Sequence, residues 1–430
     1  MKSVGGVEGH DSTQSRGLPT FRSFRNRNYR LYAAGQIVSN TGKWMQVVAE
    51  VWLVLELTGS GTAVGVVTGL RHAPLLLFGI WGGVLVDRFD KRVILLWTQV
   101  GMALTAVALG VVTGAGMATF GVICALAVLS GCFSAIDTPA RRSFIVEMVP
   151  PDDVSNAISL NSAIMTSAKV VGPAVGGLVI AAAGVAACFF LNAVSYLFLL
   201  AALALMRGEG LRGHPPTARR AGQIREGFRY AWSTPRVRGP LLVVAVLSTI
   251  AWNFNALLPL LGTQAFSTGP EGIGLLMASF AGGALIGALI TATKISVSVT
   301  YLVIATALFG VATVVTSAAP GIALAALGLV MIGATGLALF ATANSLVQGA
   351  TRMDMQGRIM GLYSVVFAGS TAIGGPIVGL LVDATSARLA LALGGIVALL
   401  VAIWAQLRIS ETSKPKSRPI GGTVGTDVWG

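Results

Sequence analysis

Five polar residues between positions 36 and 50 interrupt an apolar part of the chain, and their types could support proton transfer or the binding of a charged solute. They follow one another at steps of three or four residues, so in an α-helix they would share one face. That face holds an acid and a base and is unsuited to apolar surroundings, so we expect it to line a cavity. The five residues are Gln36, Asn40, Lys43, Gln46 and Glu50.

Two further bases, Arg71 and Lys169, also lie within apolar segments. Ionisable residues in such segments are energetically costly and usually serve a function. Glu50 is the one acid that we expect at this depth, and it could either carry a proton between two states or form a fixed ion pair that joins helices. Three bases against one acid predict a cavity of net positive charge, which favours an anionic or zwitterionic ligand. His72 follows Arg71 by one position and is expected to face elsewhere.

The composition indicates that these charges belong to a membrane protein. Hydrophobic residues make up 54% of the 430 positions and charged residues 11%, whereas soluble domains carry about 25% charged residues. Many segments approach twenty apolar residues, the length at which a helix crosses a hydrocarbon core of about 30 Å. The twelve expected spans are 30–57, 62–86, 93–113, 119–140, 155–182, 187–206, 239–261, 272–293, 299–317, 322–347, 358–382 and 388–407.

Lysine and arginine residues are distributed unequally between the two sides of this arrangement. Twenty-six of the thirty fall on one side, and because cytoplasmic loops keep such residues, both termini are expected in the cytoplasm. The net charge of +13 would also suit a nucleic-acid-binding protein, but the bases are spread over short loops that would face anionic lipids. The sequence offers no nucleophile–base pair, metal-binding cluster or phosphate-binding loop. We therefore expect no enzyme, no metal, no cofactor and no nucleic-acid partner.

The longest internal loop divides the spans into two sets of six. Its amphipathic stretch, from Ile224 to Tyr230, is expected to form a helix at the membrane surface. A Gly-Pro segment in the fifth span recurs 203 positions later, and Gly79 and Gly83 of the second span recur 204 positions later as Gly283 and Gly287. Together the two pairs indicate a duplicated six-helix unit with a binding site between the halves. The expected packing residues of these segments are Gly172, Pro173, Gly176 and Gly177, and Gly375, Pro376 and Gly379. The expected units are a cytoplasmic N-terminal tail (1–28), an N-terminal half (29–206), the central loop with its interfacial helix (207–238), a C-terminal half (239–408) and a cytoplasmic C-terminal tail (409–430).

The turn after the second span reads Gly83-Val84-Leu85-Val86-Asp87-Arg88-Phe89-Asp90-Lys91-Arg92. Gly83 would let a neighbouring helix approach closely. Asp87 would lie at a helix end, where it could pair with a base or face the N-terminus of another helix, which attracts anions. Such a contact could form in one conformation and break in another, whereas the simpler alternative is a solvated turn that only sets the topology. The residues of this expected gating latch are Gly83, Asp87, Arg88, Lys91 and Arg92.

This turn resembles the signature loop of the major facilitator superfamily, Gly-x-Leu-x-Asp-Arg-x-Gly-Arg-Lys, with Asp90 in place of its second glycine. The stretches Trp44-Met45-Gln46, Ala135-Ile136-Asp137-Thr138-Pro139-Ala140-Arg141-Arg142 and Glu226-Gly227-Phe228-Arg229-Tyr230 are similar to the drug–proton antiporter branch that includes enterobactin exporters and macrolide efflux proteins. Gly172-Pro173-Ala174-Val175-Gly176-Gly177 is similar to the end of the antiporter motif of exporters. The arginine that exporters of this kind carry early in the fourth span is missing from Leu129-Ser130-Gly131-Cys132-Phe133.

The resemblance implies an all-α membrane protein with the major facilitator fold, in which twelve transmembrane helices form two six-helix repeats. It implies export of a small organic molecule (a siderophore-like compound, a drug or a metabolite) by proton antiport with alternating access. The expected partners are the small-molecule substrate, protons and membrane lipids, for a monomer in a bacterial-type inner membrane. Proton-coupled import of a metabolite is one alternative. A non-transporting receptor or scaffold is another, although it would not need the deep charges.

Overall fold

The computed structural model describes residues 19–207, 223–292 and 298–413 of the chain. Most of the two expected tails, residues 208–222 of the central loop, and Lys294, one of the twenty-six bases counted above, lie outside this part. All regular structure within it is helical. The α-helices are α1 (Arg27–Thr58), α2 (Gly61–Arg88), α3 (Lys91–Gly114), α4 (Phe120–Met148), α5 (Val154–Ala183), α6 (Val185–Ala204), α7 (Gln223–Ser233), α8 (Pro235–Ile250), α9 (Phe254–Phe266), α10 (Pro270–Ala292), α11 (Val299–Ser317), α12 (Ile322–Ala350), α13 (Gln356–Ala384) and α14 (Ala387–Ser413).

Eleven stretches of the described chain are long and apolar enough to cross a membrane. They match eleven of the twelve expected spans, and the exception is the first. Helix α1 has 32 residues, which is long enough, but its polar residues from Gln36 to Glu50 lower its hydropathy. Its assignment as a twelfth span stays a prediction.

The span expected at 239–261 is not one continuous helix, because α8 ends at Ile250 and α9 begins at Phe254. The Asn253 side-chain amide donates to the carbonyl oxygens of Ser248 and Thr249, at 3.3 and 2.7 Å. These carbonyl groups would accept backbone hydrogen bonds if the helix continued, so the side chain competes with the helix at this point. The break separates α9, which can then lean toward the first six helices.

A helix, α7, covers the amphipathic stretch from Ile224 to Tyr230. Its Phe228 and Trp232 side chains are exposed, and their rings stack on each other. On the other side, the Tyr230 hydroxyl accepts from the backbone N–H of Arg352, which fastens α7 to the turn before α13. The position of α7 at a membrane surface stays a prediction.

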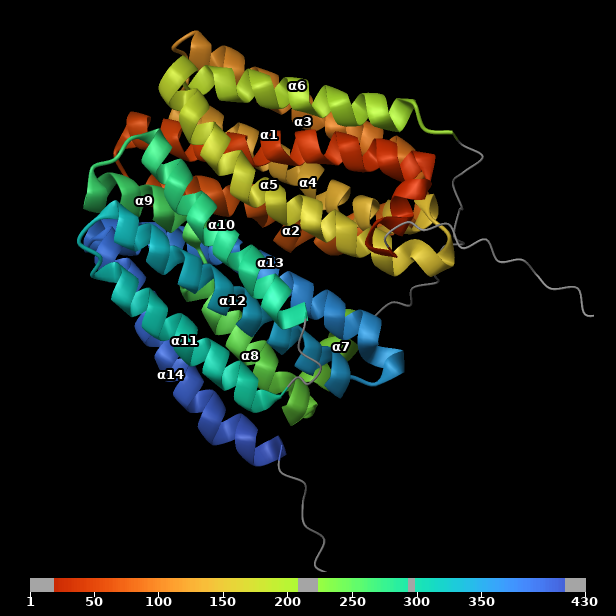
Figure 1. Ribbon diagram of the computed structural model, residues 1–430, viewed down its shortest axis with the longest axis vertical. Coiled ribbons are helices and arrows are strands. Elements are labelled where there is room, and N and C mark those ends of the chain that lie inside the picture. The colour runs from red at the N-terminus through yellow and green to blue at the C-terminus, as the bar shows by residue number, and fades with distance from the viewer. Residues whose placement is uncertain (1–18, 208–222, 293–297, 414–430) are drawn as a thin grey trace, which may run out of the picture.

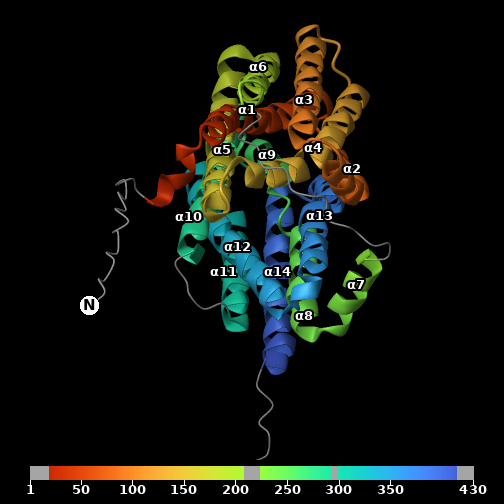
Figure 2. The same ribbon diagram turned by 90° about the vertical axis from the view of Figure 1, so that its right-hand side faces the viewer.

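Helices α1–α6 and α8–α14 form two groups that meet at one end of the molecule and diverge toward the other (Figure 1; Figure 2 shows the groups one above the other). We call the closed end the one that carries the α1–α2, α5–α6, α9–α10 and α13–α14 connections. The open end carries α7 and the α4–α5 and α12–α13 connections. Contacts of α2 with α13 and of α5 with α10 join the two groups.

Glycines bring the two groups together near the closed end. A Cβ atom at Gly65 or Gly69 would overlap backbone atoms of α13, and one at Gly177 would overlap the first residues of α10. Close backbone approach at small residues is typical of helix contacts in membranes, where packing rather than hydrophobic burial drives association. These glycines therefore hold the two groups at backbone contact distance.

Two adjacent glycines of α10 offer a matched test of this kind of packing. A Cβ atom at Gly283 would overlap the Val330 carbonyl oxygen of α12, whereas one at Gly282 would meet no described atom within 4 Å. We expect Gly283→Ala to lower stability by about 1–3 kcal/mol, the usual cost of overpacking. Gly282→Ala should leave stability unchanged or raise it by about 0.5–1 kcal/mol, because alanine favours a helix interior. Thermal unfolding of both variants in one detergent measures the difference, and equal melting temperatures would contradict the contact.

Candidate functional site

A cavity of about 170 Å³ lies near the middle of α1 and α2. Helices α1, α2 and α4 supply most of its walls, and Asn255 contributes from α9, so both groups of helices touch it. It lies about halfway along α1, the depth at which the sequence predicts a site. The described lining residues are Lys43, Trp44, Val47, Glu50, Val51, Val67, Thr68, Arg71, His72, Leu75, Gly131, Ser134 and Asn255.

Glu50 of α1 and Arg71 of α2 form an ion pair in this cavity. The Glu50 side chain is 3% exposed and the Arg71 side chain 16% exposed, so both are largely removed from water. A buried charge is strongly unfavourable without a partner, and each of these groups supplies the counter-charge of the other. The sequence leaves Lys43, Arg71 and Lys169 open as partners of Glu50, and the geometry selects Arg71.

The two lysines have different surroundings. Lys43 Nζ lies 3.4 Å from the Ser134 hydroxyl oxygen of α4. Lys169 is exposed, and its Nζ atom lies 5.4 Å from the centre of the Trp44 ring, within range of a cation–π contact. The ion pairs between described residues include neither lysine. The cavity therefore presents the uncompensated base Lys43 beside a Glu50–Arg71 pair of zero net charge.

His72 also lines the cavity, so the expectation that it faces away from Arg71 is wrong. Adjacent residues of a helix are about 100° apart, and the cavity spans enough of α2 to touch both. The His72 Nδ1 atom lies 2.9 Å from the Thr68 carbonyl oxygen. Because a carbonyl oxygen can only accept, Nδ1 carries the hydrogen and Nε2 is the ring atom that could take up a proton.

The expectation that all five polar residues of α1 line one cavity is wrong for three of them, Gln36, Asn40 and Gln46. The Asn192 amide of α6 donates to Gln46 Oε1, so Gln46 binds a helix of its own group. Asn40 and Gln46 are about 120° apart around the helix, so the five residues do not share one narrow face. Gln36 and Asn40 are buried nearer the open end and bond each other at 2.6 Å, outside the cavity. Lys43 and Glu50 are the members that line it.

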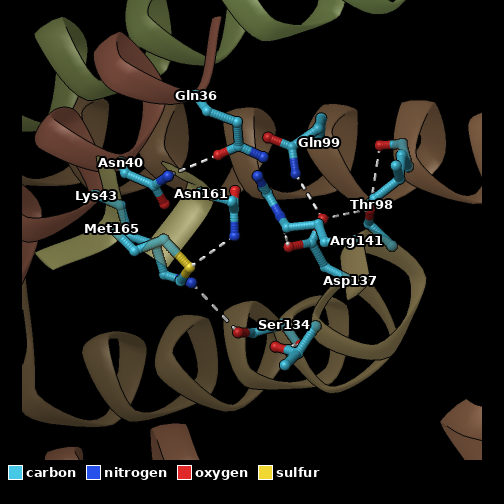
Figure 3. Close-up of polar contacts among 12 residues, drawn as sticks. Gln36, Asn40, Lys43, Thr98, Gln99, Ser134, Asp137, Arg141, Asn161 and Met165 are labelled. Atoms are coloured by element: carbon cyan, nitrogen blue, oxygen red, sulfur yellow. Dashed lines mark hydrogen bonds and ion pairs between the residues drawn. The ribbon is translucent and has the colours of Figure 1, made fainter. Parts of the chain in front are cut away.

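A second buried acid, Asp137 of α4, pairs with Arg141 one turn later, as Figure 3 shows. Asp137 also accepts hydrogen bonds from the Thr98 hydroxyl at 3.1 Å and the Gln99 amide at 2.7 Å, both on α3. Its side chain is 3% exposed. The expectation that Glu50 is the one deep acid is therefore wrong.

Arg141 is also placed differently from the sequence expectation. Counting it among the bases of a cytoplasmic turn is wrong, because α4 continues to Met148 and leaves the Arg141 side chain 13% exposed. One signal could have found the pair, since opposite charges four residues apart meet on a helix surface. Ser134, which contacts Lys43, lies one turn before Asp137 on α4, so the Asp137–Arg141 pair lies one helical turn from a lining residue of the cavity (Figure 3).

The bases of the expected latch contact helices of their own group. Lys91 Nζ lies 2.5 Å from the Glu147 carboxylate of α4, and that side chain is 9% exposed. Arg92 donates to two carbonyl oxygens at the end of α6, at 2.8 and 3.0 Å. A positive charge is favourable there, because the last carbonyl groups of a helix carry partial negative charge. Lys91 and Arg92 thus tie the start of α3 to α4 and α6.

Asp90 caps the N-terminus of α3, where its side chain accepts from two backbone N–H groups at 2.8 and 3.2 Å. Aspartate is a favoured residue at this position, which gives a structural reason for the departure from the superfamily signature. Arg88 is exposed at the end of α2. The surroundings of Gly83 and the side chain of Asp87 lie outside the part of the chain that the structure describes.

Each of the two Gly-Pro segments includes a contact with the other group of helices. Gly172 and Gly176 of α5 pack against α1, and Gly177 packs against the start of α10. In α13, Gly375 and Gly379 pack against the first turns of α2. Each segment thus meets the beginning of a helix from the other group at the closed end. The matched glycines differ in their partners, because Gly172 and Gly176 contact their own group whereas Gly375 and Gly379 contact the other group. The duplication stays a prediction.

Comparison with known proteins gives a family match over nearly the whole chain. The family of transmembrane secretion effectors matches residues 18–419. The multidrug efflux pump Tap of Mycobacterium tuberculosis is 27% identical over 396 residues, covering 85% of this chain and 90% of the pump. The staphyloferrin A transporter of Staphylococcus aureus is 26% identical over 250 residues, which cover 58% of this chain and 63% of that transporter. Macrolide efflux protein A of Streptococcus pyogenes is 23% identical and covers 64% of this chain and 68% of that protein.

Solved structures support the same fold. A bacterial homologue of the human lysosomal transporter Spinster, in an inward-facing and occupied conformation, superimposes with a TM-score of 0.70 at 15% identity, covering 92% of this chain and 98% of that one. A POT family transporter in complex with 5-aminolevulinic acid gives a TM-score of 0.75 at 12% identity, covering 90% and 97%. At these identities the likeness concerns the fold alone.

Proposed function

This chain belongs to the transmembrane secretion effector family of the major facilitator superfamily, and from that premise we propose that it exports a small organic molecule by proton antiport with alternating access. It is a multi-pass transporter of the bacterial inner membrane and not an enzyme. Relatives named as efflux proteins support export as the direction. The observation that carries the proposal is the buried Glu50–Arg71 pair, in a cavity that both groups of helices touch.

The proposed topology has twelve spans, with α1 added to the eleven apolar ones, and both termini in the cytoplasm. Arg88, Arg92, Arg352 and Arg358 lie at the open end, and the retention of bases in cytoplasmic loops supports placing that end inside the cell. The open end would then face the cytoplasm and the closed end the outside. On this assignment, the structure corresponds to an inward-facing state.

Protonation of Glu50 is the proposed coupling step. A proton that arrives from outside would remove the negative charge that holds Arg71, so the cavity would gain a positive charge and α1 would separate more easily from α2. Release of the proton into the cytoplasm would restore the pair. Lys43 and Lys169 would set the charge around it, and the latch formed by Gly83, Asp87, Arg88, Lys91 and Arg92 would bias the inner gate.

The charge of the substrate determines which coupling this pair can support. A cationic group and a proton would compete for the Glu50 carboxylate, so a substrate with such a group would exchange with protons. A simple anion would instead bind Arg71 while Glu50 is protonated, and both would travel in the same direction. Antiport through Glu50 therefore fits a zwitterion, whose positive group would approach Glu50 and whose acidic group would approach Lys43.

The decisive experiment records solute flux and proton movement together. The purified protein would be placed in liposomes with an imposed proton gradient and given anionic siderophores, zwitterionic metabolites, and neutral and cationic drugs in turn. We expect at least one compound to drive proton movement in the direction opposite to its own. Movement of both in one direction would replace antiport with co-transport, as an importer requires. Solute flux that ignores the gradient would remove the proton from the mechanism, and no flux of any compound would favour a receptor.

A further inference from the structure

The carboxylate of Asp383 connects the two groups of helices at the closed end. Asp383 lies in the last turn of α13 and accepts hydrogen bonds from the first turn of α2. The donors are the hydroxyl of Ser60 at 2.7 Å, the backbone N–H of Gly61 at 2.6 Å, and the backbone N–H and hydroxyl of Thr62 at 2.8 and 2.6 Å. One exposed side chain thus receives four hydrogen bonds from the other group.

Helix α2 already has an N-cap of its own, because the Ser60 hydroxyl accepts from the backbone N–H of Ala63 at 3.3 Å. Asp383 adds a negative charge from outside the helix, at the end where the unpaired N–H groups carry partial positive charge. The contact crosses between the groups, so it must break whenever the closed end opens. A cap within one helix would impose no such condition.

Helices α2 and α13 each carry both parts of this contact, namely glycines in the first turns and an aspartate near the end. Helices α2 and α13 share a five-position pattern, Gly-x3-Gly-x13-Gly-x3-Gly-x3-Asp, at a constant offset of 296 residues. The last segment is nearly identical in the two helices, Gly-Val-Leu-Val-Asp in one and Gly-Leu-Leu-Val-Asp in the other. The matched positions are Gly61 and Gly357, Gly65 and Gly361, Gly79 and Gly375, Gly83 and Gly379, and Asp87 and Asp383.

The two helices run in opposite directions, so the position of the aspartate in each helix is at the same end of the pair as the N-terminus of the other helix. At the closed end the elements are in contact, because a Cβ atom at Gly61 would lie 2.8 Å from Asp383 Oδ1 and one at Gly65 would overlap the Gly375 carbonyl. At the open end, a Cβ atom at Gly357 or Gly361 would meet no described atom within 4 Å. Among the described residues, the contact between these elements is thus formed at the closed end.

We propose that Asp383 is a gating residue that locks the start of α2 to α13 while the closed end is shut, as the counterpart of the latch expected at Asp87. The two contacts use opposite ends of one helix pair, so closing either end separates the elements of the other. Asp383 acts by positioning α2, and it is not among the described lining residues of the cavity. At the corresponding place in the first Gly-Pro segment, α5 has Ile180, so the charged lock is specific to the α2–α13 pair.

The test measures the width of the closed end directly and needs no substrate. Spin labels would be attached to cysteines that replace Met117 and Ala318, two exposed residues in the α3–α4 and α11–α12 connections, after Cys124, Cys132 and Cys188 are changed to alanine. We expect Asp383→Asn to raise the fraction of molecules with a wide separation about tenfold, as loss of a helix-capping carboxylate typically does. Asp383→Glu should restore part of the narrow population, because it keeps the charge.

The matched control is Asp354→Asn, which removes the same charge from an exposed pair with Arg352 before α13. It should leave the distance distribution unchanged. Thr62→Val should give a smaller shift than Asp383→Asn, because it removes one hydroxyl donor and keeps the backbone N–H. A native distance distribution in Asp383→Asn would overturn the proposal whether or not transport is found. A shift of equal size in both aspartate variants would also overturn it, since the effect would then reflect charge in general.

Discussion

Glu50→Gln is expected to reduce substrate-driven proton movement in liposomes by at least about 100-fold. Glutamine has nearly the shape of glutamate, but its amide does not take up or release a proton near neutral pH, so the coupling step is lost. The change also leaves Arg71 as a largely buried charge without a partner, which costs about 3–5 kcal/mol in buried pairs. Since 1.4 kcal/mol corresponds to a factor of ten, the conformation that buries Arg71 becomes at least about 100-fold less favourable.

Glu56→Gln is the matched control, because Glu56 lies on the same helix but is exposed. It should move substrate and protons at native rates. Measuring solute flux beside the pH change separates coupling from transport. Normal proton-coupled flux in Glu50→Gln would eliminate Glu50 as the proton carrier.

The double variant Glu50→Gln with Arg71→Met separates the two roles that the sequence leaves open. If the pair only holds α1 to α2, removing both charges should restore folding and proton-coupled transport together, because no buried charge remains unpaired. If Glu50 carries the proton, the double variant should fold but still fail to couple solute flux to the gradient. Thermal unfolding of the same preparations shows which variants are folded.

The fold class follows from composition because a low charge content and long apolar segments leave few other solutions. The resemblance to the major facilitator superfamily is confirmed over residues 18–419, since it rests on a turn whose spacing is highly specific. The break at Asn253 could not be predicted, because a single amide in an apolar run is equally compatible with a helix interior. The spacing of three or four residues also hides the spread of the five polar residues of α1, because Gln46 lies about one third of a turn around the helix from Asn40.

The candidate site could be predicted in part, because a deep charge is visible in the sequence but its partner is not. The sequence shows that Glu50 and Arg71 must be compensated, whereas only the crossing of α1 and α2 decides that they meet. The pairing of Asp137 with Arg141 is not predicted, because the fourth span is expected to end at 140 and Arg141 is therefore assigned to a loop. The continuation of α4 to Met148 makes the same two residues a buried pair.

Asp137→Asn is therefore the second change expected to have a large effect, and it should lower the free energy of unfolding by about 3–5 kcal/mol. The asparagine oxygen can still accept hydrogen bonds from Thr98 and Gln99. The change in stability therefore reports the removal of the negative charge that faces Arg141. Asp354→Asn removes a charge from an exposed pair with Arg352, and it should change stability little, because solvent screens such pairs. Thermal unfolding of both variants provides the comparison, and a native melting temperature in Asp137→Asn would show that Arg141 does not depend on this partner.

The double variant Asp137→Asn with Arg141→Gln shows whether the pair does more than stabilise α4 against α3. Removing both charges should recover most of the stability, because the remaining amides can bond one another without an unpaired charge. Transport that recovers with stability would make the pair structural. If the protein is stable but its proton movement stays low, with Glu50 and Arg71 intact, a second proton-handling group would lie at Asp137. That position is one helical turn from Ser134, which contacts Lys43 at the cavity.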